Sequence, residues 1–376
     1  MAEIFLTIFF ISVLLFFLGS GIWVALSMIG VSAIGMMLFT SRPVGDAMAT
    51  TIWGTSSSWT LTALPLFVWM GEILFRTKLS KNLFKGLSPW MQKLPGGLIH
   101  VNVVGCALFA AISGSSAATV ATVGKMSIPE LRKRNYPEKI LLGSLAGSGT
   151  LGLLIPPSII LIIYGVAVQE SIAKLFIAGI IPGIMIALIF MSYVIIWSLI
   201  NKKKMPKILE EYSFLEKLKR SKQLLPVIIL ISAVIGSIYT GIATATEAAS
   251  LGVVGALVLS YFQRSLNLET FKSSLLGATK TSCMIAFILA GSTFLSLAMG
   301  FTGLPRNLAI WIQNMDLSPY VLIFVLMIFY IILGMFLDGI SAVVLTMAII
   351  EPMIRQAGFD MIWFGIFLVI VVEMAQ

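Results

Sequence analysis

Charged residues are scarce in this sequence, and their scarcity decides the class of protein. Only 11% of the 376 residues are charged, whereas 59% are hydrophobic and the mean hydropathy is +1.03. A soluble globule needs more polar side chains than this to cover its surface. Apolar stretches recur along the whole length and leave no room for a separate soluble domain of ordinary size. The composition therefore predicts an all-α polytopic membrane protein.

Cysteine and histidine are also rare. Cys106 and Cys283 both lie in apolar runs, so they indicate neither a disulfide framework nor a metal site. His100 is the only histidine, and a structural role at a membrane border is favoured over metal binding or proton transfer. No GxxxxGK[ST] motif occurs, and the GxGxxG match at 147–152 lies in an apolar segment without a βαβ context. We therefore expect no cofactor and no enzymatic activity.

The basic residues are distributed in a way that predicts topology. The net charge is +9, and 21 of the 25 Lys and Arg residues fall within 76–93, 125–139, 201–222 and 263–280. These connections should face the cytoplasm under the positive-inside rule, which places the N-terminus on the periplasmic side. No basic patch is interleaved with aromatic residues on a soluble module, so nucleic-acid binding is not expected.

Apolar length, read against the charged connections, predicts helices and two re-entrant hairpins. Residues 97–131 are flanked on both sides by cytoplasmic charge, so this segment should turn back inside the lipid bilayer. Residues 318–356 form a second apolar stretch interrupted at 338–342, and 201–222 is a basic connection on the membrane surface. The other helices are expected near 4–18, 20–39, 60–77, 79–93, 138–164 (broken at 152–158), 172–200, 223–239, 247–262 and 281–301.

The two hairpins predict an internal repeat. Ser113-Gly114-Ser115-Ser116-Ala117 and Asp338-Gly339-Ile340-Ser341-Ala342 agree at three of five positions. Pro129 follows Ser113 by 16 residues, and Pro352 follows Asp338 by 14. Charge counting places the hairpins on opposite sides, which is typical of an inverted-topology repeat in a secondary transporter.

Small, polar and helix-breaking residues at the predicted membrane depth are the candidate solute site. Broken helix survives there only where it lines an enclosed or watery cavity. Hydroxyl and carbonyl oxygens are hard donors that suit Na⁺, and helix termini attract ions of opposite sign. The simpler alternative is that small residues only let helices pack closely. The candidates in the first repeat are Ser113, Gly114, Ser115, Ser116, Gly149, Thr150, Gly152, Pro156, Pro157 and Ser158.

Acidic residues within apolar segments are further candidates, because a charge near the bilayer centre costs about 2.5 to 3.5 kcal/mol. Asp338 is the strongest, since it occupies the second hairpin tip. Glu72 and Glu351 lie near predicted helix ends, where snorkelling or a local hydrogen bond accounts for them. Glu247 follows Thr244-Ala245-Thr246, and a helix-capping role and a gating or coupling role remain equally open.

These residues carry a resemblance to the large membrane subunit of TRAP (tripartite ATP-independent periplasmic) transporters. It runs over essentially the whole chain, and the Gly-Leu-Leu-Ile-Pro-Pro-Ser stretch is specific. The similar stretches are Ala63-Leu64-Pro65-Leu66-Phe67 through Gly71-Glu72, Ser113 to Thr119, Gly149 to Ser158, Tyr239 to Ala249, Asp338-Gly339 and Glu373-Met374-Ala375-Gln376.

The resemblance implies a Na⁺-driven elevator importer in the bacterial inner membrane. Its substrates are expected to be organic acids such as C4-dicarboxylates or sialic acid, delivered by a periplasmic substrate-binding protein. A small membrane subunit completes the system. The first Na⁺ site should use Ser113–Ser116 with Gly149–Gly152. The second should use Asp338, Gly339 and Ser341 with a break after Gln376.

The same resemblance assigns ranges to the chain. Residues 1–96 should form scaffold helices and an arm, 97–200 the first transport repeat with its broken helix at 138–164, and 201–222 the cytoplasmic connection. Residues 223–317 should form the second scaffold and arm. Residues 318–376 should form the second hairpin and the start of a second broken helix.

Three alternatives accompany this interpretation. The family pattern continues beyond Gln376 into a second Pro-Pro break, so a shortened, non-transporting remnant is one. Proton coupling through Asp338 or Glu247 is another. The third is an intramembrane aspartyl protease, which is disfavoured because that chemistry needs two facing carboxylates and only Asp338 among the aspartates lies deep.

Overall fold

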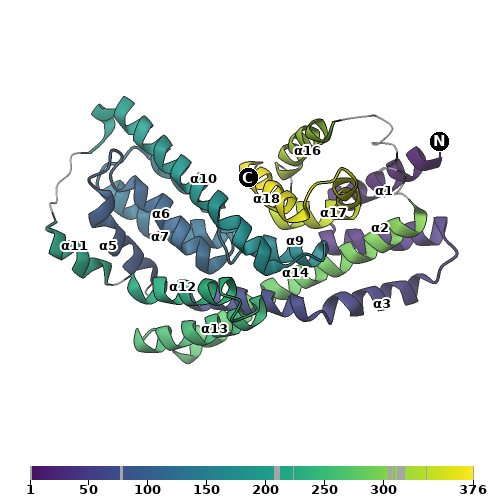
Figure 1. Cartoon of the computed structure of the whole chain (residues 1–376), viewed down its shortest axis with the longest axis horizontal. Coiled ribbons are helices and arrows are strands. Elements are labelled where there is room, and N and C mark those ends of the chain that lie inside the picture. Colours follow the sequence, from purple (N-terminus) through teal and green to yellow (C-terminus); the bar gives the residue numbers. More distant parts are fainter. Residues whose placement is uncertain are drawn as a thin grey trace. The chain divides into compact units, whose positions relative to one another are not determined.

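The computed structural model describes residues 2–76, 79–206, 212–222, 224–303, 307, 310, 318–335 and 337–375. Every regular element in these residues is a helix (Figure 1), which confirms the all-α prediction. The chain divides into two compact units. We call Ala63–Leu161 with Ala173–Lys280 the central unit, and Met1–Thr62, Ile162–Ile172 and Thr281–Gln376 the terminal unit.

The central unit holds the first predicted hairpin and the first broken helix. Two helices continue from it into the terminal unit, α9 (Ile159–Ala167) and α14 (Leu268–Thr302). Its other elements are α4 (Ala63–Phe75), α5 (Leu79–Met91), α6 (Ile99–Ser113), α7 (Ser116–Lys133), α8 (Glu138–Gly149), η2 (Thr150–Leu153), α10 (Ile172–Ile200), η3 (Lys202–Lys204), α11 (Phe214–Ser221), α12 (Leu225–Tyr239) and α13 (Ala245–Phe262).

The first predicted hairpin is present as α6 and α7, which lie side by side (Figure 1). α6 ends at Gly114, which adopts φ +59°, a left-handed conformation that glycine reaches without steric cost. α7 begins one residue later, after Ser115. The prediction of a hairpin within 97–131 with its tip at the serines is therefore confirmed at the level of helices.

The predicted break in 138–164 is also present. α8 passes into η2, residues 154–158 are not helical, and α9 begins at Ile159. The Pro156–Pro157 peptide bond is cis. α10 packs on this break through its glycines, because a Cβ atom at Gly179 would lie 3.0 Å from the carbonyl oxygen of Leu154. Small residues in α10 thus let a helix approach the broken backbone closely.

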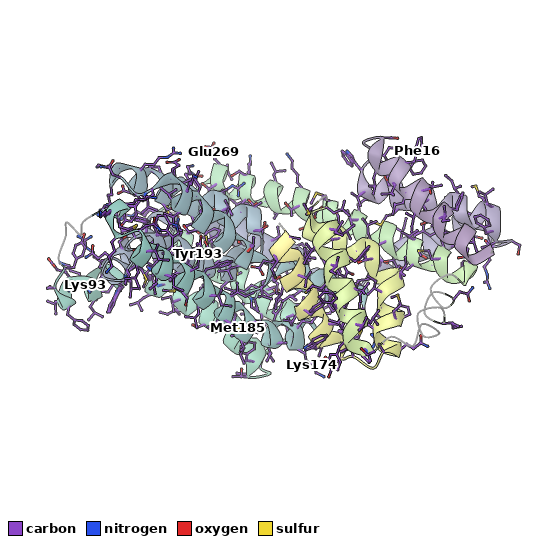
Figure 2. The ribbon with its side chains drawn as sticks, turned by 90° about the horizontal axis from the view of Figure 1, so that it is seen from above. Phe16, Lys93, Lys174, Met185, Tyr193 and Glu269 are labelled. Carbon is purple, nitrogen blue, oxygen red and sulfur yellow. The ribbon has the colours of Figure 1, made fainter. Side chains whose placement is uncertain are left out.

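α10 has the length and surface of a membrane-spanning helix. Its 29 residues extend over roughly 44 Å, more than the roughly 30 Å of a hydrocarbon core. The side chains of Met185 and Tyr193 are exposed on it (Figure 2). Exposed apolar side chains along a helix of this length suit contact with lipid.

The terminal unit contains the second predicted hairpin. Tyr330 of this hairpin is fully buried, and its hydroxyl lies 2.6 Å from the hydroxyl of Thr346. Tyr164, near the end of α9, donates a 2.6 Å hydrogen bond to the carbonyl of Met361. The remaining elements of this unit are α1 (Ala2–Gly19), α2 (Val24–Phe39), α3 (Val44–Ser56), η1 (Trp59–Thr62), α16 (Pro319–Gly334), α17 (Gly339–Gln356) and α18 (Met361–Ala375).

Several helices are apolar and long enough to span a membrane. Among the residues that the structure describes, four pass by length and composition alone, and up to six pass if two bent helix pairs are each counted as one span. The four are Ile172–Ile200, Ala245–Phe262, Leu268–Thr302 and Gly339–Gln356. The prediction of a multi-pass membrane protein agrees with these helices.

Two helices differ from the sequence-based prediction. α3 is not predicted, because its mixture of threonine, glycine and Asp46 gives it little apolar character, and none of its residues is buried. α14 begins at Leu268 rather than near 281, because the apolar run covers only its second part. The Asn267 side chain accepts a 2.6 Å hydrogen bond from the Thr270 N–H and so caps the charged beginning of this helix.

The internal repeat is present, but its register differs from the sequence alignment by two residues. α7 and α17 are both 18 residues long, and an oxygen of Ser115 or Asp338 caps each N-terminus. Pro129 and Pro352 each follow their cap residue by 14 positions. Ser115 is therefore equivalent to Asp338, and the alignment of Ser113 with Asp338 was wrong. It matched two glycines with different roles, since Gly114 ends α6 whereas Gly339 begins α17.

Candidate functional site

The tip of the α6–α7 hairpin is a tight turn built by Gly114 and Ser115. The Gly114 N–H donates a 3.1 Å hydrogen bond to the carbonyl of Ala110 and closes α6. Ser115 is extended, and its Oγ accepts a hydrogen bond from the N–H of Ala118 at 3.5 Å. The first amides of α7 therefore point toward the tip, where the helix dipole is positive.

Two buried hydroxyls hold this turn. The Thr119 Oγ1 donates to the carbonyl of Ser115 at 2.7 Å, and the Ser113 hydroxyl lies 2.8 Å from the Thr119 Oγ1. The N–H of Ser115 donates to the Ser113 Oγ at 3.4 Å. Ser113 and Thr119 are thus committed to fixing the turn. Ser115 and Ser116 are half-buried, and the Ser116 hydroxyl has no hydrogen bond to any described residue.

The broken helix packs backbone against backbone on this tip. A Cβ atom at Gly152 in η2 would lie 2.7 Å from the carbonyl oxygen of Ser115 and 2.9 Å from the nitrogen of Ser116. Neither atom belongs to a flexible side chain, so only glycine fits at this position. Gly149, at the end of α8, sits directly against the Val120 side chain of α7.

The Pro-Pro segment meets the same tip from its other end. A Cβ atom at Gly114 would lie 2.8 Å from the carbonyl oxygen of Pro157, and the Ile159 N–H donates to the carbonyl of Gly114 at 3.3 Å. Pro156 and Pro157 have no backbone N–H. Two carbonyls that would accept hydrogen bonds from these positions in a continuous helix therefore lack those donors. The structure therefore brings together residues that are more than 30 positions apart in the sequence.

Two predicted ligands already have hydrogen-bond partners in the structure. The buried Ser158 hydroxyl donates to the carbonyl of Leu153 and accepts from the N–H of Leu161 at 3.4 Å, which makes it the cap of α9. The Thr150 Oγ1 donates to the carbonyl of Gly147 at 2.7 Å. The Ser158 hydroxyl therefore stabilises the start of α9, and the Thr150 hydroxyl can offer a ligand only its lone pairs.

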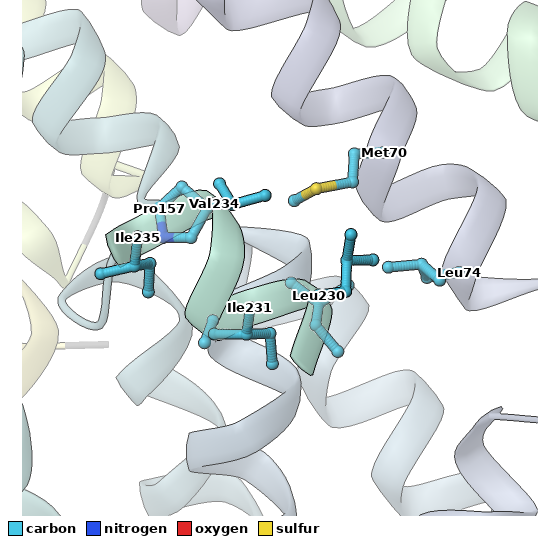
Figure 3. A pocket seen from close by; sticks show the side chains of 9 residues that line it. Met70, Leu74, Pro157, Leu230, Ile231, Val234 and Ile235 are labelled. Atoms are coloured by element: carbon cyan, nitrogen blue, oxygen red, sulfur yellow. The ribbon is translucent and has the colours of Figure 1, made fainter. Parts of the chain in front are cut away.

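One wall of the break is apolar. Met70 and Leu74 of α4 face Leu230 and Val234 of α12, and Pro157 lies beside Val234 and Ile235 (Figure 3). The crevice between them leaves no room for a water molecule. Because apolar side chains close this side, the polar groups of the tip are shielded from solvent there.

Comparison with known proteins decides the class. The family model described as "Tripartite ATP-independent periplasmic transporter, DctM component" matches residues 9–376. The chain belongs to this family. It is thus a membrane permease by descent, and the predicted resemblance is confirmed.

Curated relatives of this TRAP-family chain are named as large permease proteins. The C4-dicarboxylate TRAP transporter large permease protein DctM of Pseudomonas aeruginosa is 33% identical over 342 residues, which cover 91% of this chain and 79% of that one. The sialic acid TRAP transporter large permease protein SiaM of Vibrio cholerae is 30% identical over 350 residues, with 92% and 81% covered.

A solved structure shares the fold. The Alcanivorax borkumensis YdaH transporter superposes with a TM-score of 0.64 and covers 96% of this chain, with 87% of its own chain covered. The sequence identity is 11%, so the likeness concerns architecture alone. This likeness in architecture agrees with the predicted fold class.

The second tip of this TRAP-family chain begins α17 in the terminal unit. The Asp338 carboxylate accepts a 3.2 Å hydrogen bond from the N–H of Ser341, so it caps the helix. Asp338 is exposed, whereas Gly339 and Ser341 are buried. The capping position explains why an acidic residue is tolerated at the start of an otherwise apolar helix. Gln376, where the predicted second break would follow, lies outside the described residues.

The other acidic candidates have local partners. Glu247 forms a capping box with Thr244, because its carboxylate accepts from the Thr244 N–H at 2.8 Å while the Thr244 hydroxyl accepts from the Glu247 N–H. Of the two roles considered for Glu247, the capping role is present. Glu72 pairs with Arg76, and Glu351 pairs with Arg355, each one turn away on the same chain segment.

Two residues that position the tip were not predicted as site residues. Thr119 links Ser113 to the carbonyl of Ser115, and its place four residues after Ser115 was the available signal. Gly71 of α4 also touches the tip, because a Cβ atom there would lie 3.1 Å from the carbonyl oxygen of Ile112. No local pattern marks Gly71, since its partner is about 40 residues away.

Within the described part of the chain, no three His, Cys, Asp or Glu residues cluster as a transition-metal site would require. The groups gathered at the first tip are instead hydroxyls, carbonyls and amides. Carbonyl and hydroxyl oxygens are hard donors, which suit a hard cation such as Na⁺, and the amides suit a carboxylate.

Proposed function

We propose that this chain is the large permease subunit of a Na⁺-coupled importer for small organic acids in the bacterial inner membrane. A periplasmic binding protein would deliver the substrate, and a small membrane subunit would complete the complex. The N-terminus would lie on the periplasmic side, as the distribution of basic residues indicates.

The observation that carries this proposal is the backbone contact between Gly152 and the Ser115–Ser116 peptide. It joins a broken helix to a hairpin tip in a chain whose family consists of permeases. Irregular backbone at membrane depth is stable only where protein or enclosed water surrounds it. Secondary transporters use such discontinuous helices to bind substrate and coupling ion.

Sodium would bind to oxygens of the first tip. Ser113–Ser116 and Gly149–Gly152 are the proposed ligand segments, and the free hydroxyl of Ser116 is the best candidate within them. A second Na⁺ site would use Asp338, Gly339 and Ser341. The equivalence of Ser115 and Asp338 as cap residues supports two related sites.

The substrate would be an organic acid. Named relatives act on C4-dicarboxylates and sialic acid, both of which carry carboxylates at neutral pH. The N-terminal amides of α7 supply partial positive charge at the tip, which favours a carboxylate there. The identity of the acid would be set largely by the binding protein.

The two hairpins would form an inverted repeat that moves as an elevator. In this proposal, 97–200 and 318–376 carry the substrate, whereas 1–96 and 223–317 form the scaffold. Equal lengths of α7 and α17, with a proline 14 positions after each cap, support a shared origin of the hairpins.

Uptake by the reconstituted complex tests this function. The permease, its small subunit and its binding protein in liposomes should accumulate a C4-dicarboxylate or sialic acid when an inward Na⁺ gradient is applied. Ser116→Ala removes a hydroxyl that has no partner in the described chain, and should weaken the Na⁺ dependence by roughly tenfold through the loss of about 1.5 kcal/mol. Ser192→Ala is the matched control, because that exposed hydroxyl only donates to the carbonyl of Leu188.

Two results would contradict the proposal. Uptake driven by a pH gradient in sodium-free buffer would show that H⁺, and not Na⁺, is the coupling ion. Equal Na⁺ dependence of Ser116→Ala and Ser192→Ala would remove the hairpin tip from the Na⁺ site.

A further inference from the structure

A polar cavity lies in the central unit, away from the hairpin tip. It is an open cleft of about 990 Å³ between the end of α4, α5, the C-terminal half of α7 and α11. Its volume is at the upper end of the range of small-molecule sites. Apart from Phe75 and Thr122, its described lining residues come from the connections that the charge distribution places at the cytoplasmic surface.

The cleft is strongly basic. Among the described residues, its walls include five cationic side chains and one acidic side chain, that of Glu130. The cationic residues are Arg76, Lys85, Lys125, Arg134 and Arg220. A cleft lined by one sign of charge concentrates its field and attracts ions of the opposite sign.

Two of these cations, Lys85 and Lys125, have neither an ion-pair nor a hydrogen-bond partner among the described residues. Arg76 is paired with Glu72. The Arg220 guanidinium lies 4.2 Å from the centre of the Tyr212 ring and donates to its hydroxyl at 3.0 Å. In contrast, Lys85 and Lys125 are exposed and have no acidic partner among the described residues.

A buried hydroxyl in the wall also lacks a partner. Thr122 of α7 is 3% exposed and lines the cleft, yet its Oγ1 forms no hydrogen bond. Threonines in helices commonly donate to the carbonyl one turn earlier, as Thr119 and Thr346 do here. Leaving a buried hydroxyl unsatisfied costs about 1 to 3 kcal/mol, which a ligand acceptor would recover.

The rim of the cleft has the character of a membrane surface. α11 carries basic residues together with exposed Phe214 and Leu215, which are 69% and 78% exposed. Trp90 of α5 donates to the hydroxyl of Ser221 at 2.7 Å, and Lys217 lies 5.5 Å from the Trp90 ring centre. Aromatic and basic side chains beside an apolar edge are typical of a helix at the level of lipid head groups.

We propose that this cleft binds a phosphate group, and that the source of the phosphate is the head group of an anionic phospholipid in the facing leaflet. Lys85 on α5 and Lys125 on α7 hold the phosphate from two sides, and Thr122 donates to one of its oxygens. The acyl chains lie along the apolar edge of α11. The bound head group links the first hairpin to the neighbouring amphipathic helices.

The test compares a lipid with a soluble phosphate. Detergent-purified full-length protein is titrated with short-chain phosphatidylglycerol, short-chain phosphatidylcholine and glycerol 3-phosphate, and binding is followed by native mass spectrometry and by calorimetry. Lys85→Gln and Lys125→Gln should each weaken phosphatidylglycerol binding by about fivefold. Glu130→Gln, which removes the acidic side chain found among the described cleft residues, should strengthen it.

The controls separate this site from general charge and from misfolding. Lys202→Gln combined with Lys203→Gln removes two exposed positive charges of η3, outside the cleft, and should leave the affinity within twofold. Thr122→Val keeps the shape of the side chain, and should reduce affinity without lowering the midpoint of thermal unfolding.

Each outcome is decisive. Weaker phosphatidylglycerol binding in the cleft variants alone, with little binding of glycerol 3-phosphate, supports the lipid site. Equal binding of glycerol 3-phosphate supports the phosphate chemistry but overturns the lipid as its source. Equal loss in the η3 control, or no loss in the cleft variants, overturns the site. No step of this test depends on transport activity.

Discussion

Gly152 packs directly on Ser115: a Cβ atom at position 152 would lie 2.7 Å from the Ser115 carbonyl oxygen. This contact joins two segments whose helices are interrupted for different reasons, one by a glycine turn and the other by two prolines. The polar backbone groups of the hairpin tip and of the broken helix lie next to each other only because Gly152 has no side chain to separate them.

Gly152→Ala should therefore destabilise the protein. Overpacking against backbone atoms costs about 1 to 3 kcal/mol, because neither partner can rotate away. Gly143→Ala on α8 is the matched control, since no atom lies within 4 Å of its Cβ position and alanine is the better helix former by about 1 kcal/mol. Thermal unfolding in detergent should show a lower midpoint for Gly152→Ala and an unchanged or higher one for Gly143→Ala. Equal midpoints would mean that the tip and the broken helix do not touch.

Gly114→Ala tests the other end of the same contact. Its φ of +59° makes any Cβ unfavourable by about 1 to 2 kcal/mol, and the close Pro157 carbonyl adds a clash. Gly241→Ala separates the two effects, because Gly241 has φ +71° with no atom within 4 Å of its Cβ position. Denaturation should show the larger loss of stability for Gly114→Ala, by about 1 to 3 kcal/mol. If Gly114→Ala loses no more stability than Gly241→Ala, the loss comes from backbone strain alone and the clash with Pro157 is excluded.

Thr119→Val should loosen the tip. The substitution removes the hydroxyl that bonds the Ser115 carbonyl and the Ser113 hydroxyl, at an expected cost of about 1 to 3 kcal/mol. Thr119→Ser restores the hydroxyl and should recover most of the stability. Thr279→Val, at an exposed helical position, should change the unfolding free energy by less than about 0.5 kcal/mol. Equal unfolding free energies of the Thr119→Ser and Thr119→Val variants would contradict the role of this hydroxyl in holding the tip.

Asp338 has a structural and a proposed functional role, and two substitutions separate them. Asparagine caps helices nearly as well as aspartate, so Asp338→Asn should leave stability almost unchanged, whereas Asp338→Ala should lose about 1 kcal/mol. If the carboxylate also serves a Na⁺ site, Asp338→Asn should reduce Na⁺-dependent uptake. Normal uptake by Asp338→Asn together with normal folding would limit Asp338 to capping α17.

The sequence was sufficient to locate both hairpins and the first break, because the signals for them are local. Gly114 can adopt the left-handed conformation that ends a helix, and Pro156–Pro157 removes two consecutive N–H donors. Partners distant in sequence could not be predicted, and Gly71, which touches the carbonyl of Ile112, is one of them. The repeat was aligned two residues out of register because identical glycines outweighed the cap positions of Ser115 and Asp338.

Helix bounds failed where apolar character was the sole guide. No residue of α3 is buried and the helix mixes polar with apolar residues, so a search for apolar runs passes over Val44–Ser56. α14 begins N-terminal to its apolar part. Asn267 caps a first turn that contains charged residues, and a search for apolar runs does not detect such a turn. Both cases show that hydropathy locates buried or lipid-facing segments better than it locates helices.

The central claim is that the two hairpins enter the membrane from opposite faces, and labelling of single cysteines tests it most directly. Lys125 on α7 and Tyr320 on α16 are both exposed, and Cys283→Ser removes the exposed native cysteine while Cys106 is buried. In this background, a membrane-impermeant maleimide should label Lys125→Cys only from the cytoplasmic face and Tyr320→Cys only from the periplasmic face. Labelling of both positions from the same face would contradict the inverted repeat.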